Sequence, residues 1–156
     1  MKVEKDYEDL LKLFNKYKVQ YCIIGAFAVA FYAKPRYTKD IDILVSSDIK
    51  NGERIIAALY EFGFRNIELK AEDFTAGNQI IQLGYEPVRI DILTYIAGCS
   101  FAEIWQSRKS GLYGKEKVYF IGLNQLIKNK EAAHRKQDMA DLDLLKKAQQ
   151  RLKNKK

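Results

Sequence analysis

The chain has 156 residues, of which 47% are hydrophobic and 30% charged, a composition typical of one folded domain spanning residues 1–156. No apolar run approaches the ~18 residues that cross a bilayer, so we expect no membrane-spanning segment. Residues 1–6 are charged and lack the apolar stretch of a secretory signal, and the two cysteines are typical of buried thiols in a reducing compartment. These features predict a cytoplasmic protein. The net charge of +7 is concentrated near the C-terminus.

Hydrophobic periodicity predicts alternating helices and strands at the start of the chain. Apolar residues at helical spacing favour a helix over 4–17, and the apolar run 20–24, stopped by Gly25, favours a buried strand. The small apolar stretch 26–33 predicts a helix packed closely on a sheet, which Pro35 ends.

The rest of the chain continues this mixture of elements. Residues 51–62 predict an amphipathic helix that ends at Gly63. The other expected elements are strands at 40–45, 64–69, 78–84, 88–93 and 117–121, a helix after Gly98, and helices at 123–135 and 138–152. The pattern favours an α/β or α+β fold with a mixed β-sheet flanked by helices and closed by C-terminal helices.

Carboxylates on two of the expected strands are the strongest chemical signal. Side chains two residues apart on a strand leave the same face, so Asp40 and Asp42 lie together, roughly 6–7 Å apart along the backbone. Asp91 sits on the expected strand 88–93. If the two strands are neighbours, three carboxylates meet and suit Mg²⁺ or Mn²⁺. Ordinary polar alternation on two half-buried strands explains the same pattern equally well.

Other residues point to negatively charged ligands. Gly25-Ala26 joins a strand to a helix, and a helix N-terminus offers free N–H groups to a phosphate. Lys130 falls on the apolar stripe of its helix, where a lysine either extends to the surface or meets an anion. Arg36 and Lys39 flank the Asp pair and are either exposed loop charges or further anion contacts.

Residues 146–156 form a basic tail with six Lys or Arg and no acid. Cations at the end of a helix suit the helix dipole, so the tail is consistent with a solvated helix end. The alternative is an arm that attracts phosphates or nucleic acid.

Together these motifs resemble the nucleotidyltransferase fold of the DNA polymerase beta superfamily. Its signature is a hydrophobic residue, Gly and Gly or Ser, then Asp-hydrophobic-Asp/Glu-hydrophobic and a later Asp. Here the matching residues are Ile24-Gly25-Ala26, then Asp40-Ile41-Asp42-Ile43 after thirteen residues, and Asp91. The segment 126–141 also resembles the closing helices of small bacterial nucleotidyltransferases related to abortive-infection and toxin–antitoxin systems.

The resemblance implies an enzyme that transfers NMP from an NTP and releases pyrophosphate. Asp40, Asp42 and Asp91 would be catalytic and would hold Mg²⁺ or Mn²⁺. The nucleotide would contact Gly25, Ala26, Arg36, Lys130 and Arg135. A small molecule, a tRNA end and a protein side chain all remain open as the acceptor, and a cognate toxin or antitoxin is an implied partner.

Two departures from the pattern keep alternatives open. Ala26 replaces a Gly or Ser, which removes a hydroxyl donor worth about 1.5–3 kcal/mol, and Gln137 stands where a Lys is common. The main alternative is therefore a weakly active or inactive nucleotidyltransferase-fold protein, acting as an antitoxin or partner subunit. A further alternative is a basic nucleic-acid-binding protein whose carboxylates are incidental.

Overall fold

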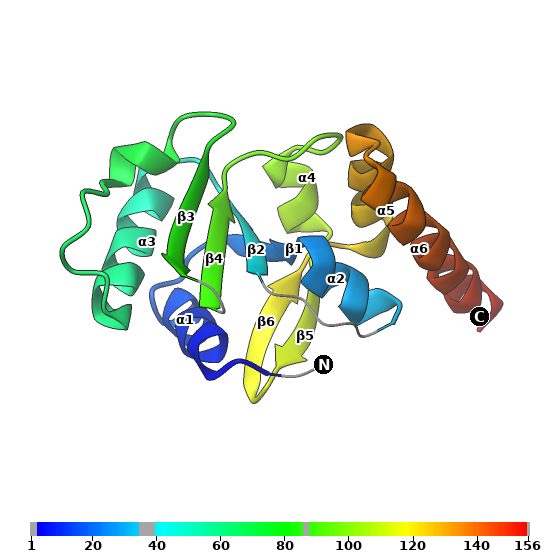
Figure 1. Cartoon of the computed structure of the whole chain (residues 1–156), viewed down its shortest axis with the longest axis horizontal. Coiled ribbons are helices and arrows are strands. Elements are labelled where there is room, and N and C mark those ends of the chain that lie inside the picture. The colour runs from blue at the N-terminus through cyan, green and yellow to red at the C-terminus, as the bar shows by residue number, and fades with distance from the viewer. Residues whose placement is uncertain (1–2, 35–39, 86–87, 156) are drawn as a thin grey trace.

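The computed structural model describes residues 3–34, 40–85 and 88–155, which form a mixture of helices and strands (Figure 1). The elements are α1 (Lys5–Lys16), β1 (Tyr21–Ile24), α2 (Gly25–Tyr32), β2 (Asp40–Val45), α3 (Ile49–Phe62), the 3-10 helix η1 (Ala71–Phe74), β3 (Ile80–Tyr85), β4 (Val88–Leu93), α4 (Phe101–Gln106), β5 (Lys109–Tyr113), β6 (Glu116–Phe120), α5 (Leu123–Ala133) and α6 (Lys136–Asn154).

Within the described residues, the strands form one six-stranded sheet in the order β3-β4-β2-β1-β6-β5. The sheet is mixed, because β2 pairs with β4 and β1 with β6 in parallel, whereas the β1–β2, β3–β4 and β5–β6 pairs are antiparallel. The central strand β1 is buried along its whole length, as expected for a short apolar run. The expected mixed α/β fold is confirmed.

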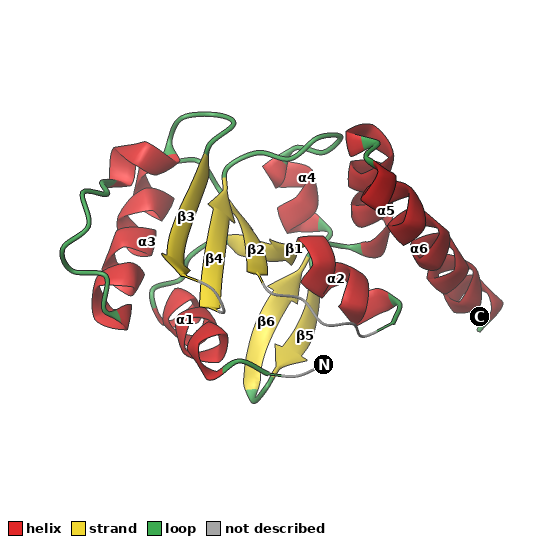
Figure 2. Ribbon diagram, in the orientation of Figure 1, coloured by secondary structure: helices red, strands yellow, loops and turns green. Residues whose placement is uncertain are grey.

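The helices cover the sheet according to their apolar faces. Residues Tyr7, Leu10, Leu11 and Phe14, at helical spacing, bury one side of α1, which packs against α3. The small and apolar α2 contacts β1, β2 and α6. Helices α5 and α6 pack together at the end of the molecule away from α3 (Figure 2). No helix of the described residues is long and apolar enough to cross a membrane.

The prediction of a strand at 64–69 is wrong, since these residues form no strand. Their half-buried apolar side chains instead pack onto the outside of the core, where the rings of Phe62 and Phe64 stack with centroids 5.6 Å apart. Alternating burial can therefore arise in an extended loop without a pairing partner.

Strand β5 was not expected from the sequence. Its hairpin with β6 turns at Gly114, whose φ of 63° at the first central position is typical of a type II′ turn. Leu112 on β5 is 68% exposed. The strand therefore lacks the alternation of buried apolar and exposed polar residues by which other strands can be predicted from sequence. The remaining expected elements are present, with ends that differ by a few residues.

Candidate active site

An acidic wall is formed by the parallel pairing of β2 with β4. In this register Asp42 lies opposite Asp91, and Asp40 lies opposite Arg89. Because side chains alternate along each strand, these four residues share one face of the sheet, while Ile41 and its neighbours on the other face are buried in the core. The two Asp-bearing strands are thus neighbours, which is the condition on which the three carboxylates were expected to meet.

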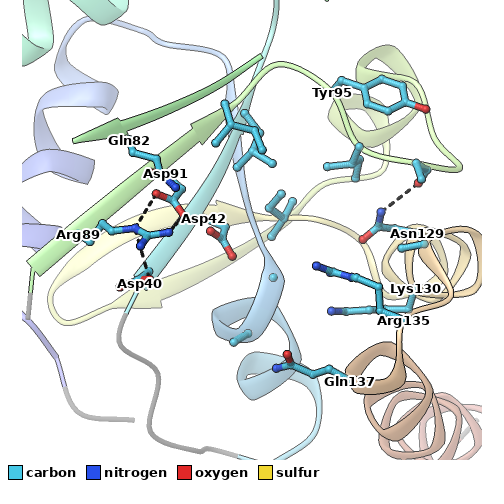
Figure 3. Close-up of a pocket in the computed structure, with 18 residues that line it drawn as sticks. Asp40, Asp42, Gln82, Arg89, Asp91, Tyr95, Asn129, Lys130, Arg135 and Gln137 are labelled. Carbon is cyan, nitrogen blue, oxygen red and sulfur yellow. Dashed lines mark hydrogen bonds and ion pairs between the residues drawn. The ribbon is translucent and has the colours of Figure 1, made fainter. Parts of the chain in front are cut away.

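Arg89 lies among these carboxylates. Its Nε and Nη2 atoms each lie 3.1 Å from a carboxylate oxygen of Asp91, and its Nε lies 3.5 Å from Oδ2 of Asp40 (Figure 3). The guanidinium thus binds Asp91 in a bidentate manner and bridges to Asp40. The acidic wall carries its own compensating charge.

Asp42 is a carboxylate whose surroundings disfavour its negative charge. Burial, followed by repulsion from the carboxylates of Asp91 and Asp40, raises its pKa to about 7 from an ordinary value of 3.8. The positive charge of Lys130 acts in the opposite direction. A nearby cation would stabilise the charged form of such a buried carboxylate.

The turn between β1 and α2 brings the backbone against this carboxylate. Ile24 pairs with Asp42, and Gly25 follows with a φ of 67° as the first residue of α2. A Cβ atom on Gly25 would collide with Oδ2 of Asp42, so no side chain fits there. No described side chain caps the N-terminus of α2, which leaves the amides of its first turn for a ligand.

A cationic wall faces the acidic one across the cavity. Lys130, from α5, and Arg135, at the start of α6, extend toward the acidic wall in Figure 3. Nζ of Lys130 lies 3.1 Å from Asp138 and 3.3 Å from Asp141, and Nε of Arg135 lies 2.9 Å from Asp138. Lys130 is only 5% exposed, and both aspartates are fully buried.

The sequence places Arg135 at this wall through a tight helix junction. His134 ends α5 in the left-handed conformation, with a φ of 54°, and its N–H donates to the carbonyl of Lys130. The backbone N–H of Arg135 then donates to the carboxylate of Asp138, three residues into the next helix. Asp138 thus fixes the start of α6 and pairs with both cations.

The two walls enclose a cavity of about 800 Å³. An apolar rim, made by Ile80, Leu93, Tyr95 and Ile96, adjoins the acidic wall, and Gln82 lies opposite Asp91 on the edge strand β3. Ile80 is 60% and Tyr95 53% exposed. The cavity therefore combines an acidic side, a cationic side and an open apolar edge.

No protein-family model and no curated protein matches this sequence. Solved structures do match. The lincomycin-bound crystal structure of the lincosamide antibiotic adenylyltransferase LnuA superposes with a TM-score of 0.57 at 18% identity, over 92% of this chain and 96% of that one. The chain has the nucleotidyltransferase fold. A nucleotidyltransferase-like protein from Paracoccidioides brasiliensis, described as antigenic, superposes with a TM-score of 0.55 at 12% identity, over 92% of this chain and 77% of that one.

This nucleotidyltransferase fold brings most of the predicted site residues together. Those lining the cavity are Gly25, Ala26, Asp40, Asp42, Asp91, Lys130 and Arg135. Arg36 lies outside the described residues. Sequence reasoning gave no role to Arg89, Gln82 or Tyr95, which line the same cavity. Arg89 could have been found, because its position two residues before Asp91 places both side chains on the same face of the strand. Nothing in the sequence marked Gln82 or Tyr95.

The donor atoms suit a hard divalent cation in chemistry but do not converge as placed. Oδ1 of Asp40 is buried and has no hydrogen-bond donor among residues 3–34, 40–85 and 88–155. Over the same residues, no three acidic, histidine or cysteine side chains form a group that could hold a metal ion. The guanidinium of Arg89 stands between Asp40 and Asp91, so a cation shared by the three carboxylates requires Arg89 to move aside.

We expect Gly25→Ala to displace Asp42 and to destabilise the fold. The methyl group meets Oδ2 of Asp42, and the left-handed backbone adds strain of about 1–3 kcal/mol. Urea unfolding measures the loss. Gly77→Ala is the control, because no atom lies within 4 Å of a Cβ at that position. Equal stability of the two variants would contradict the close contact with Asp42.

Proposed function

We propose that this protein is a nucleotidyltransferase that moves NMP from an NTP to an acceptor hydroxyl. The observation that carries the proposal is the position of Asp42. It lies beside Asp91 and against the N-terminus of α2, in a cavity whose opposite wall holds Lys130 and Arg135. Carboxylates and free backbone amides on one side, with cations on the other, are what a metal-bound triphosphate requires.

In this proposal the triphosphate lies between the two walls. Free amides of Gly25 and Ala26 donate to phosphate oxygens, and Arg135, whose side chain is 75% exposed, reaches the same group. Lys130 adds positive charge from below the surface. Arg36 is a further proposed contact from outside the described residues.

The acidic wall has two proposed tasks. Asp40 and Asp42 would hold Mg²⁺ or Mn²⁺, and that cation would supply neutralisation of the triphosphate charge and polarisation of the reacting phosphorus. Asp91 accepts the proton of the acceptor hydroxyl, whose oxygen forms a bond to the α-phosphorus while the bond to pyrophosphate breaks. In this proposal the residues act by positioning the substrates and by compensating their charge. Arg89 contacts both Asp40 and Asp91, so its position affects the proposed tasks of both carboxylates.

The test of the proposal is nucleotide binding that depends on Mg²⁺. At about 100 times its dissociation constant, ATP should add roughly 2.7 kcal/mol to the free energy of unfolding. Thermal unfolding with ATP, GTP, CTP and UTP, with and without Mg²⁺, measures this gain. A gain that needs Mg²⁺, followed by pyrophosphate release on adding an acceptor, supports transfer. No gain with any nucleotide at millimolar concentration would contradict it.

For the acceptor, the open apolar edge favours a small hydroxylated molecule with an apolar face. Ile80 and Tyr95 are half-exposed and uncharged, and Gln82 offers hydrogen bonds next to Asp91. Lincomycin, the antibiotic bound in the LnuA crystal structure, is therefore a sensible first acceptor to try.

We expect Tyr95→Ser to raise the KM for such an acceptor about tenfold or more without changing the KM for the nucleotide. The reason is the loss of roughly 1.5–3 kcal/mol of apolar contact. Steady-state pyrophosphate release with each substrate varied in turn separates the two constants. Tyr60→Ser, a similarly exposed tyrosine on α3, is the matched control. A change in the nucleotide KM instead would place Tyr95 on the triphosphate side.

A second candidate is a catalytically weak partner subunit, such as an antitoxin. Two observations favour it: Arg89 separates the carboxylates, and Ala26 lacks a hydroxyl. This candidate predicts a protein that co-purifies with the chain and no pyrophosphate release with any acceptor.

The role of the basic tail in binding RNA stays a prediction, which the salt dependence of RNA binding can test.

A further inference from the structure

A second cavity, of about 480 Å³, lies at the opposite end of β1 from the acidic site. Residues 18–20, which line it, come directly before β1, whereas Gly25 comes directly after it. At ~3.3 Å per residue, Gln20 and Gly25 are about 16 Å apart along the strand. The two cavities share no lining residue.

Positive charge dominates the rim of this second cavity. Lys18, Arg54 and Lys117 come from three separate segments of the chain, and no described residue lining the cavity is acidic. Over the described ranges, none of the three cations has a carboxylate within 4.0 Å, and the nearby Glu116 accepts a hydrogen bond from Asn15 instead. Three like charges around one hollow repel one another, so an anion is the natural occupant.

Aromatic rings form the apolar part of the same cavity. Trp105 on α4 and Tyr119 on β6 both line it, with ring centroids 5.6 Å apart. The guanidinium of Arg108 lies 3.7 Å from the centroid of Trp105 and 4.8 Å from that of Tyr119, and it also donates to the carbonyl of Trp105. Arg108 therefore fixes both rings, which lowers the entropy that a ligand would lose by ordering them.

We propose that this second cavity binds a nucleotide unit, with the base against Trp105 and Tyr119 and the phosphate among Lys18, Arg54 and Lys117. Combining aromatic rings with a positively charged groove is the usual way that proteins hold unpaired nucleotides. The volume falls within the ~300–1,000 Å³ of small-molecule sites. A free mononucleotide and one residue of a single-stranded RNA offer the same chemistry.

The test uses the fluorescence of Trp105, the only tryptophan of the chain. The intact protein, without divalent cations, is titrated with AMP, adenosine, inorganic phosphate and single-stranded oligoadenylate. We expect saturable quenching by AMP and weaker responses to adenosine and to phosphate alone. Tighter binding of oligoadenylate with a steeper salt dependence would identify a strand as the ligand, and affinity equal to that of AMP would identify the free nucleotide.

Matched variants locate the bound ligand. The triple variant Lys18→Asn, Arg54→Gln and Lys117→Gln should weaken AMP binding about tenfold or more, the loss of at least one charged hydrogen bond. Asparagine at position 18 tolerates the left-handed φ of 58° found there. The control triple, Lys146→Gln, Arg151→Gln and Lys153→Gln, removes the same charges from exposed positions on α6 and should change affinity less than twofold.

Three results would overturn the proposal: no saturable change of Trp105 fluorescence, equal weakening by both triple variants, or loss of the response in Asp42→Asn. The last would place the ligand in the acidic cavity. Because the readout involves neither Mg²⁺ nor pyrophosphate, its failure is distinct from a failure of nucleotidyl transfer.

Discussion

Replacing Asp42 with asparagine is expected to lower nucleotidyl transfer by on the order of 10³-fold or more, about 4 kcal/mol of transition-state stabilisation, while the fold persists. Asp42 lies against Gly25, beside the proposed triphosphate site, and its pKa is raised. Initial rates of pyrophosphate release measure the loss. Asp143→Asn, at an exposed carboxylate on α6, is the control and should retain full activity. Substantial activity in Asp42→Asn would contradict the proposed site.

The same variant should be more stable than the wild type at neutral pH in buffer without divalent cations. Because the folded-state pKa of Asp42 is raised to about 7, the folded protein binds its proton more tightly than the unfolded chain does. The wild type therefore loses stability as the pH rises from about 4 to 7, by at most about 4 kcal/mol. Asparagine carries no charge and escapes this loss, so the difference should appear over that range and level off above it.

Urea unfolding at several pH values measures this difference. A constant difference between Asp42→Asn and the wild type from pH 4 to pH 8 would mean that Asp42 titrates normally. Addition of Mg²⁺ should narrow the difference at pH 8 if the cation binds beside Asp42.

Lys130→Met is expected to give the largest loss of stability, about 3–5 kcal/mol. It leaves the fully buried carboxylates of Asp138 and Asp141 without their shared cation. Burial raises the pKa of Asp138, but hydrogen bonds from Arg135 and Lys130 outweigh it and hold the pKa at about 2. Asp138 is thus expected to be charged in the wild type.

Equilibrium urea unfolding tests this expectation. The control is Lys128→Met on the same helix, where an exposed pair with Glu103 is worth at most about 1 kcal/mol. Adding Asp138→Asn and Asp141→Asn to Lys130→Met should recover part of the loss, because the buried negative charges that have lost Lys130 disappear. If Lys130→Met costs no more than Lys128→Met, the buried ion cluster does not stabilise the helix junction.

The sequence predicted the site best where the two-residue period of a strand places chemically similar side chains on one face. Alternation along one strand correctly predicted that Asp40 and Asp42 share a face, and the pairing of β2 with β4 meets the condition on which Asp91 joins them. It could not predict Arg89 as their bridge, since a charged residue on a strand face has no fixed partner until the strand register is known. Register depends on long-range pairing that one strand alone does not encode.

The partners of Lys130, on a helix, also could not be predicted from the local sequence. Its place on an apolar stripe left two interpretations open, a side chain that extends to the surface or one that meets an anion. The structure buries it, and the partners that it finds, Asp138 and Asp141, lie 8 and 11 residues further along the chain. They reach Lys130 because α5 and α6 fold back at His134, a residue that carried no turn signal in the sequence.

The division of charge between the sheet and the last two helices has a consequence for biosynthesis. Every described strand precedes α5, so a nascent chain can assemble the acidic wall before Lys130 and Arg135 are made. At ~5–20 residues per second, translation of α5 and α6 takes about 2–6 s. During that interval Arg89, two residues before Asp91, supplies the positive charge that balances the carboxylates of the acidic wall. Without it, the pairing of β2 with β4 in an early sheet would bring together carboxylates that repel one another.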